Sequence, residues 1–112
     1  MKIAIPCAEK QLCAHFGHCE EFALVTVDRE KGTIGDTAWE TPPPHEPGLL
    51  PRWLGEKDVN LVIAGGMGMR AQQLFVDRGI KVVTGAPVGS PEALIRSWLD
   101  DSLKTGANLC DH

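Results

Sequence analysis

The sequence lacks several features that identify whole classes of protein. No apolar run approaches the roughly 20 residues of a membrane-spanning helix, and the first residues become polar too soon for a signal peptide. The chain has 11 Lys and Arg residues and 15 Asp and Glu residues, so its formal net charge is −4. It therefore has no excess of basic residues that would form a nucleic-acid-binding surface. These absences predict a cytoplasmic protein that binds neither membranes nor nucleic acids.

Signatures of common enzymes are also missing. There is no Gly-x-Ser-x-Gly nucleophile elbow, and the runs 2–6 and 60–64 carry none of the carboxylates that a metal-dependent nuclease needs on neighbouring strands. Residues 66–71 have the glycine spacing of a dinucleotide fingerprint, but the next strand, 80–83, does not end in the required acid. The P-loop lysine is absent too. We therefore expect a non-catalytic protein.

What the chain does contain is an ordinary globular composition and a clear alternation of elements. Of its 112 residues 43% are hydrophobic and 23% charged, which favours one domain, placed at residues 1–106 with a tail at 107–112. Apolar runs predict strands, and 3.6-residue periodicity predicts helices that begin near Leu49, after the glycines at 65–68, and at Pro91. The predicted strands are 2–6, 22–28, 33–40, 60–64 and 80–83.

The order of these elements predicts an α/β fold with a mixed five-stranded sheet and helices on both faces. The first half reads as an antiparallel hairpin, and the second half alternates strand and helix, as in parallel sheets. Strand 2–6 should lie between the hairpin and strand 60–64, which makes it a topological switch point. Ligands of such sheets bind outside the carboxyl ends of the strands. Three loops start there: 7–20, 65–69 and 85–89.

The segment 41–48 holds four prolines in eight residues. Proline is excluded from helix interiors and central strands. The segment is therefore predicted to be a stiff connector within the domain, or a lid.

The first loop concentrates soft metal donors. Cys13, His15, His18 and Cys19 fall within seven residues, and thiolate and imidazole suit zinc, copper and iron–sulfur species. The spacing is not that of a zinc finger, and four ligands so crowded would hardly close one tetrahedron. A metal site that uses two of these side chains, together with ligands from elsewhere in the chain, would be easier to form.

Elsewhere, the tail offers Cys110 and His112 as further donors. The alternative is that the cysteines fill space as small apolar groups and the histidines lie at the surface. That alternative is favoured for Cys7, at the end of a buried strand. Because a cytosolic chain of this size needs no disulfides, we expect reduced thiols.

The second loop, Gly65-Gly66-Met67-Gly68, precedes a helix. Backbone amides at a helix N-terminus attract anions, although a loop of glycines can equally serve close packing. Arg70 in the first turn either adds positive charge or faces solvent.

The stretches Lys-Ile-Ala-Ile-Pro, His-Phe-Gly-His-Cys, Leu-Val-Ile-Ala-Gly-Gly-Met-Gly-Met-Arg-Ala and Gly-Ile-Lys-Val-Val-Thr-Gly-Ala together resemble the dinitrogenase iron–molybdenum cofactor biosynthesis family. That family includes nitrogenase accessory proteins that hold cofactor precursors, and the orange protein of sulfate reducers, which carries a molybdenum–copper sulfide cluster. The resemblance runs from Met1 to about Leu103 and implies a ribonuclease-H-like fold. It places His15, Phe16 and Gly17 on the family's signature loop. Many members have arginine in place of His18 and lack the cysteines at 13 and 19.

Two hypotheses of different class follow. The first is a carrier or scaffold for an anionic metal–sulfur cluster containing molybdenum with iron or copper, which passes its cargo to an acceptor protein. The second is a thiol-based redox or protein-interaction module, in which Cys13 and Cys19 react and no cluster binds. For the first, the predicted metal ligands are Cys13, His15, His18, Cys19, Cys110 and His112, with Phe16, Gly17, Gly65, Gly66, Met67, Gly68 and Arg70 as further cluster-binding residues.

Overall fold

A mixed β-sheet forms the centre of the computed structural model, which describes residues 1–13, 19–44 and 48–103. The strand order is β4-β3-β1-β5-β6, and β2 pairs with β1 beside this path. β1 is parallel to β5 and antiparallel to β3, so both the mixed sheet and the predicted neighbours of the central strand are confirmed. The strands are β1 (Lys2–Ala8), β2 (Gln11–Leu12), β3 (Glu21–Asp28), β4 (Thr33–Glu40), β5 (Leu61–Ile63) and β6 (Lys81–Val83).

The sheet has six strands rather than the predicted five, because β1 runs beyond Pro6 and pairs with β2. The expectation that Pro6 ends the strand is wrong for a physical reason. Pairing with β5 reaches only to Ala4, and the Pro6 carbonyl on that side accepts a hydrogen bond from the Cys13 amide at 3.0 Å. The Pro6 nitrogen points to the same side. Proline has no amide proton to donate, and none is needed there because the pairing with β5 has already ended at Ala4.

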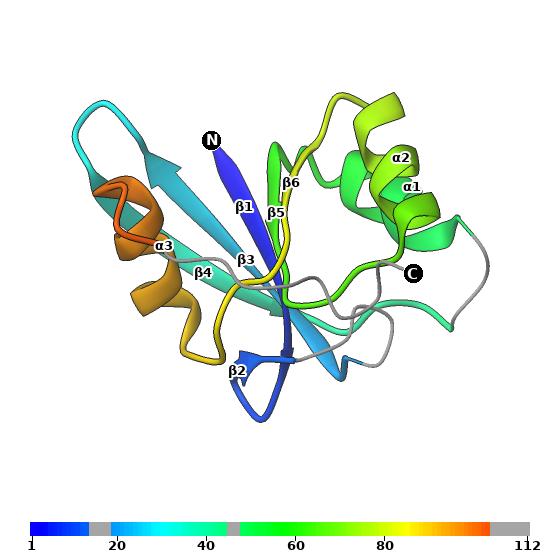
Figure 1. Ribbon diagram of the computed structural model, residues 1–112, viewed down its shortest axis with the longest axis horizontal. Helices are drawn as coiled ribbons and strands as arrows, with labels where there is room; N and C mark the ends of the chain where they lie inside the picture. Colours follow the sequence, from blue (N-terminus) through cyan, green and yellow to red (C-terminus); the bar gives the residue numbers. More distant parts are fainter. Residues whose placement is uncertain (14–18, 45–47, 104–112) are drawn as a thin grey trace.

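Among the described residues, three helices cover the sheet: α1 (Leu49–Glu56), α2 (Met69–Asp77) and α3 (Pro91–Leu99). Figure 1 shows α1 and α2 on one side of the sheet and α3 on the other, as predicted. Alternate residues of β1 face the two layers. Ile3 and Ile5 pack with Leu94 and Ile95 of α3, whereas Ala4 belongs to the cluster that holds residues of α1 and α2. Within the described ranges, no helix is long and apolar enough to cross a membrane.

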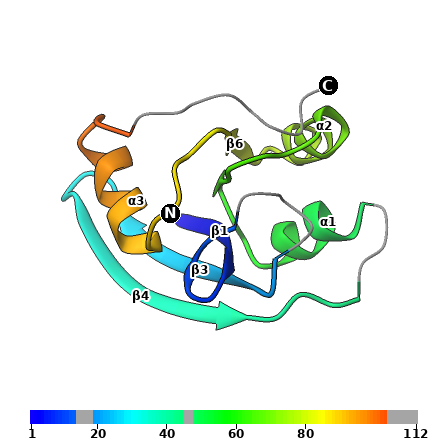
Figure 2. The same ribbon diagram turned by 60° about the horizontal axis from the view of Figure 1, so that its bottom comes forward.

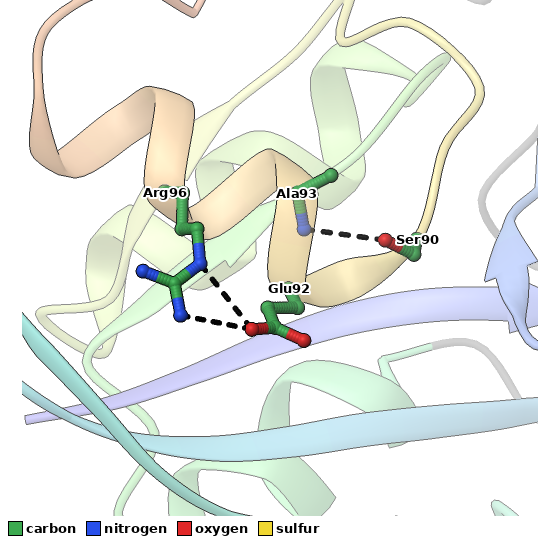
Figure 3. Close-up of polar contacts among 4 residues, drawn as sticks. All are labelled: Ser90, Glu92, Ala93 and Arg96. Atoms are coloured by element: carbon green, nitrogen blue, oxygen red, sulfur yellow. Dashed lines mark hydrogen bonds and ion pairs between the residues drawn. The ribbon is translucent and has the colours of Figure 1, made fainter.

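The start of α3 follows the signals in its sequence. The Ser90 side chain accepts a hydrogen bond from the Ala93 amide at 3.2 Å (Figure 3). Pro91 occupies the first helical position. Glu92 in the first turn pairs with Arg96 one turn later, at 2.9 Å. Because both side chains are largely exposed, that ion pair contributes only about 0.3–0.5 kcal/mol. The cap fixes where α3 begins, directly after the loop 85–89.

The turn between β1 and β2 places two ordinary residues in the left-handed region. Glu9 has φ 54° and Lys10 has φ 65°. A tight hairpin of this kind normally uses Asn or Gly there. Neighbours hold the turn instead: the Glu9 amide donates to the Glu20 carboxylate at 3.0 Å, and the Lys10 ammonium pairs with Glu21 at 2.9 Å.

We expect Glu9→Asn to stabilise the protein by about 0.5–1 kcal/mol, because asparagine tolerates the left-handed conformation and the Glu9 contact uses only the backbone amide. Thermal unfolding should show a midpoint higher by about 2–5 °C. Glu30→Asn, in the exposed turn after β3 and without a positive φ, is the matched control and should leave the midpoint unchanged. Equal shifts in both variants would show that turn strain is not the cause.

Cys7 on β1 is the buried thiol of the core. It is fully buried, and its Sγ donates to the Ile5 carbonyl at 3.4 Å. Burial raises the pKa of Cys7 from 9.0 to about 11, since the thiolate is poorly solvated there. The prediction from sequence that Cys7 fills space in the core is in keeping with this environment.

Cys7 should therefore resist alkylation by iodoacetamide at pH 8 in the folded protein, as followed by peptide mapping. A two-unit rise in pKa lowers the thiolate fraction about 100-fold, and burial slows access further. In urea, Cys7 should react like any free thiol. The same shift makes the free energy of unfolding fall as pH rises from about 9 to 11, where only the unfolded chain loses the proton. Rapid labelling of Cys7 in the folded state would contradict this assignment.

Candidate functional site

Three loops meet at the carboxyl ends of the parallel strands, the end that comes forward in Figure 2. Main-chain hydrogen bonds join them: the Leu12 amide donates to the Gly89 carbonyl at 2.9 Å, and the Gly85 amide to the Gly65 carbonyl at 2.6 Å. The segments that the sequence analysis placed at one edge of the sheet are thus physically linked in the structure. This end is the candidate site.

Cys13 and Cys19 are joined by a disulfide, with their Cα atoms 5.9 Å apart. Main-chain hydrogen bonds to β1 hold the segments on either side of the pair: the Cys13 amide donates to Pro6, and the Glu20 amide to Cys7, both at 3.0 Å. The structure therefore brings these two predicted ligands together, but it departs from the expectation of reduced thiols. A disulfide sulfur has no thiolate to offer a metal, so ligation by this pair requires its reduction.

In the glycine loop, residues 65–68, two residues are buried and two are half-exposed. The Met67 side chain is fully buried in the cluster that contains Phe75, and the Met67 carbonyl accepts from the Gln72 side chain at 2.9 Å. The predicted role of Met67 in cluster binding therefore cannot involve its side chain, which is part of the core. Gly66 is also buried, whereas Gly65 and Gly68 are half-exposed.

The N-terminus of α2 follows directly. Gly68 is its extended N-cap and supplies no side-chain cap, so the amides of the first turn have no acceptor within the helix. Arg70 lies in that turn with an exposed side chain. The amides of the first turn and an arginine residue thus both belong to the start of α2, an arrangement that suits an anion.

A cavity of about 240 Å³ lies beside the disulfide. The segment 41–43 and the first turn of α1 form one wall, and the start of β3 the other. Sequence reasoning did not connect the proline-rich segment with the cysteine loop, because only tertiary folding brings them together. The run of prolines, predicted as a connector or lid, was the one available signal. The lining residues are Cys19, Glu20, Phe22, Thr41, Pro42, Pro43 and Leu50.

Several predicted site residues lie outside the described ranges: His15, Phe16, Gly17, His18, Cys110 and His112. Among residues 1–13, 19–44 and 48–103, no three His, Cys, Asp or Glu side chains gather as a metal site would require. The described part of the site therefore consists of one cysteine pair, a helix N-terminus, an arginine and a cavity.

Comparison with known proteins gives the same fold. A protein of Methanocaldococcus jannaschii, MJ0580, is 31% identical over 109 residues, which cover 93% of this chain and 90% of that one. The crystal structure of PH0822 superposes with a TM-score of 0.87 at 27% identity and 96% coverage of both chains. The apo orange protein of Desulfovibrio gigas superposes with a TM-score of 0.74 at 18% identity, over 96% of this chain and 93% of that one.

The family model described as dinitrogenase iron-molybdenum cofactor matches residues 1–101, which is nearly the whole of the described chain. The structural neighbours described above share the fold of this chain. The chain belongs to the dinitrogenase iron-molybdenum cofactor family.

Proposed function

We propose that the protein is a non-catalytic carrier or scaffold, with the ribonuclease-H-like fold that its resemblance implies. Its cargo would be an anionic metal–sulfur cluster, either an iron–molybdenum cofactor precursor or a molybdenum–copper sulfide. The cluster would bind at the loop end of the sheet and pass to an acceptor protein.

One observation carries this proposal: a sulfur pair and a helix N-terminus are linked at the same end of the sheet. The links run from Leu12 to Gly89 and from Gly85 to Gly65, and they involve only main-chain atoms. Sulfur donors suit the metals of such a cluster, and the amides of α2 suit its negative charge. A carrier of such a cluster needs both the sulfur donors and the anion-binding amides, but it needs no catalytic group.

The charges around the site favour an anion more than the sequence suggests. Glu20 and Glu21 stand next to Cys19, where negative charge would repel the cargo. Glu20, however, accepts a hydrogen bond from the Glu9 amide, and Glu21 pairs with Lys10. Both carboxylates are thus engaged with the β1–β2 turn, while the exposed Arg70 at the start of α2 supplies positive charge.

Ligation is proposed for the reduced form. Cys19 and His15 are assigned as the principal ligands, with His18 and Cys13 next and Cys110 and His112 as auxiliary donors. Phe16, Gly17, Gly65, Gly66 and Gly68 would shape the contact surface.

The test adds tetrathiomolybdate and Cu(I) to the reduced protein and removes unbound metal by gel filtration. We expect visible absorption bands and molybdenum to elute with the protein, and amide chemical-shift changes to concentrate in residues 13–19 and 65–69. Metal-free elution, or shift changes confined to the opposite end of the sheet, would refute the proposal.

Arg70→Gln should weaken cluster retention by roughly 2–5-fold, the equivalent of about 0.5–1 kcal/mol for one exposed charge contact. Added salt should weaken retention in the parent protein more than in the variant. The matched control is Arg78→Gln, an exposed arginine at the opposite end of α2, which should retain the cluster like the parent. Equal losses in both variants would remove the assigned role of the helix N-terminus.

A further inference from the structure

The Cys13–Cys19 pair is positioned by the sheet. Cys13 and Glu20 are hydrogen-bonded to successive residues of β1, Pro6 and Cys7. In a strand, successive carbonyls point to opposite sides, so the disulfide joins two segments that flank β1. The registers agree, since Cys7 faces Leu12 on one side and Glu21 on the other. The backbone therefore holds the two cysteines near each other whether or not the bond is present.

The two sulfur-bearing residues differ in access. Cys13 is buried, with 9% of its surface exposed, whereas Cys19 is half-buried and lines the 240 Å³ cavity. The cavity wall includes Pro42 and Leu50, which offer an apolar surface to a small thiol. An external thiol or disulfide that enters this cavity meets Cys19 first.

We propose that Cys13 and Cys19 form a thiol–disulfide exchange pair in which Cys19 is the sulfur attacked from outside. In reduction, an external thiolate attacks Cys19 Sγ, the Cys13–Cys19 bond breaks, and Cys13 leaves as the thiolate. A second external thiolate then attacks the external sulfur of the mixed disulfide, which releases Cys19 as thiolate and an external disulfide. Oxidation is the reverse: a small disulfide accepts the two electrons and leaves as two thiols.

Cys7 does not take part in this exchange. Its side chain belongs to the core cluster between the sheet and α3, where it is fully buried and hydrogen-bonded to the Ile5 carbonyl. Attack on the neighbouring disulfide would require a thiolate, which its burial disfavours. The pair therefore exchanges with external partners without shuffling to Cys7.

The exchange has a consequence that rests on the proposed function. Cys13 and Cys19 offer sulfur donors to a metal only in their dithiol state, because thiolate is the ligand form of cysteine. Oxidation by a small disulfide thus removes both donors at once. The redox state of the pair would decide whether the loop end accepts its cargo.

The first experiment uses the apo protein in a Cys110→Ser background, with glutathione disulfide as the probe. After reduction and desalting, acid-quenched samples are analysed by intact mass and peptide mapping. Cys13→Ser leaves Cys19 alone and should form a stable mixed disulfide at least about tenfold faster than Cys19→Ser, which leaves the buried Cys13. The parent with both cysteines should close its own disulfide and accumulate little adduct.

Cys13→Ala serves as a second variant if serine disturbs the buried position, and circular dichroism checks that each variant is folded. In the unsubstituted pair, the transient adduct should map to Cys19. Equal rates at the two positions, faster reaction at Cys13, or an adduct that persists in the parent would overturn the exchange assignment.

A second experiment loads the oxidised and reduced proteins with tetrathiomolybdate and Cu(I), without added reductant in the oxidised sample. Retention at least about tenfold higher in the reduced protein supports the switch. Equal retention overturns the switch and leaves the carrier function intact. No retention in either state refutes the carrier function and the switch together, while the glutathione mapping still decides the exchange assignment.

Discussion

The structure depends on the unequal pairing of its central strand. β1 pairs with β5 only as far as Ala4, but it continues along β3 to Cys7 and ends at Ala8. The last residues of β1 therefore have main-chain groups that the parallel part of the sheet does not use. β2 and Cys13 take those on the β5 side, and on the β3 side the Glu20 amide extends the pairing by donating to the Cys7 carbonyl. The site exists because a strand buried on both faces extends past its parallel neighbour.

The same strand lies between the two core clusters of the protein. Residues of α1 and α2 pack against one face and residues of α3 against the other, so the core supports the loops without contributing their chemistry. The loop after β5 leads into α2, and the loop after β6 leads into the capped start of α3. Main-chain hydrogen bonds join these two loops to each other and join the second of them to β2. This arrangement keeps a helix N-terminus and a cysteine pair at one end of the sheet, which is what the proposed carriage of a charged cluster would require.

Sequence patterns predicted most of the fold because its main elements obey local rules. The apolar runs of β1 and β5, the hairpin of β3 and β4, and the Ser90 cap of α3 each follow from residues close in the chain. β2 was missed because it has two residues and its turn uses Glu9 and Lys10, which are not turn formers; contacts with Glu20 and Glu21 hold that turn. The sequence showed that the cysteines cluster. Their pairing, however, depends on the hydrogen bonds to β1, and the cavity next to Cys19 depends on where the proline-rich segment lies. Local sequence therefore located the two cysteines but not their pairing or their surroundings.

The anchors of the cysteine pair are formed by main-chain atoms alone. The amides of Cys13 and Glu20 and the carbonyls of Pro6 and Cys7 would remain if the side chains between the two cysteines were exchanged. The hydrogen bonds at the end of β1 thus hold the two ends of the cysteine loop without using any side chain of that loop. A designer could replace the five residues between Cys13 and Cys19 with other donor sets and keep the same scaffold. These anchors therefore set no requirement on the donor chemistry of the residues that they hold in place.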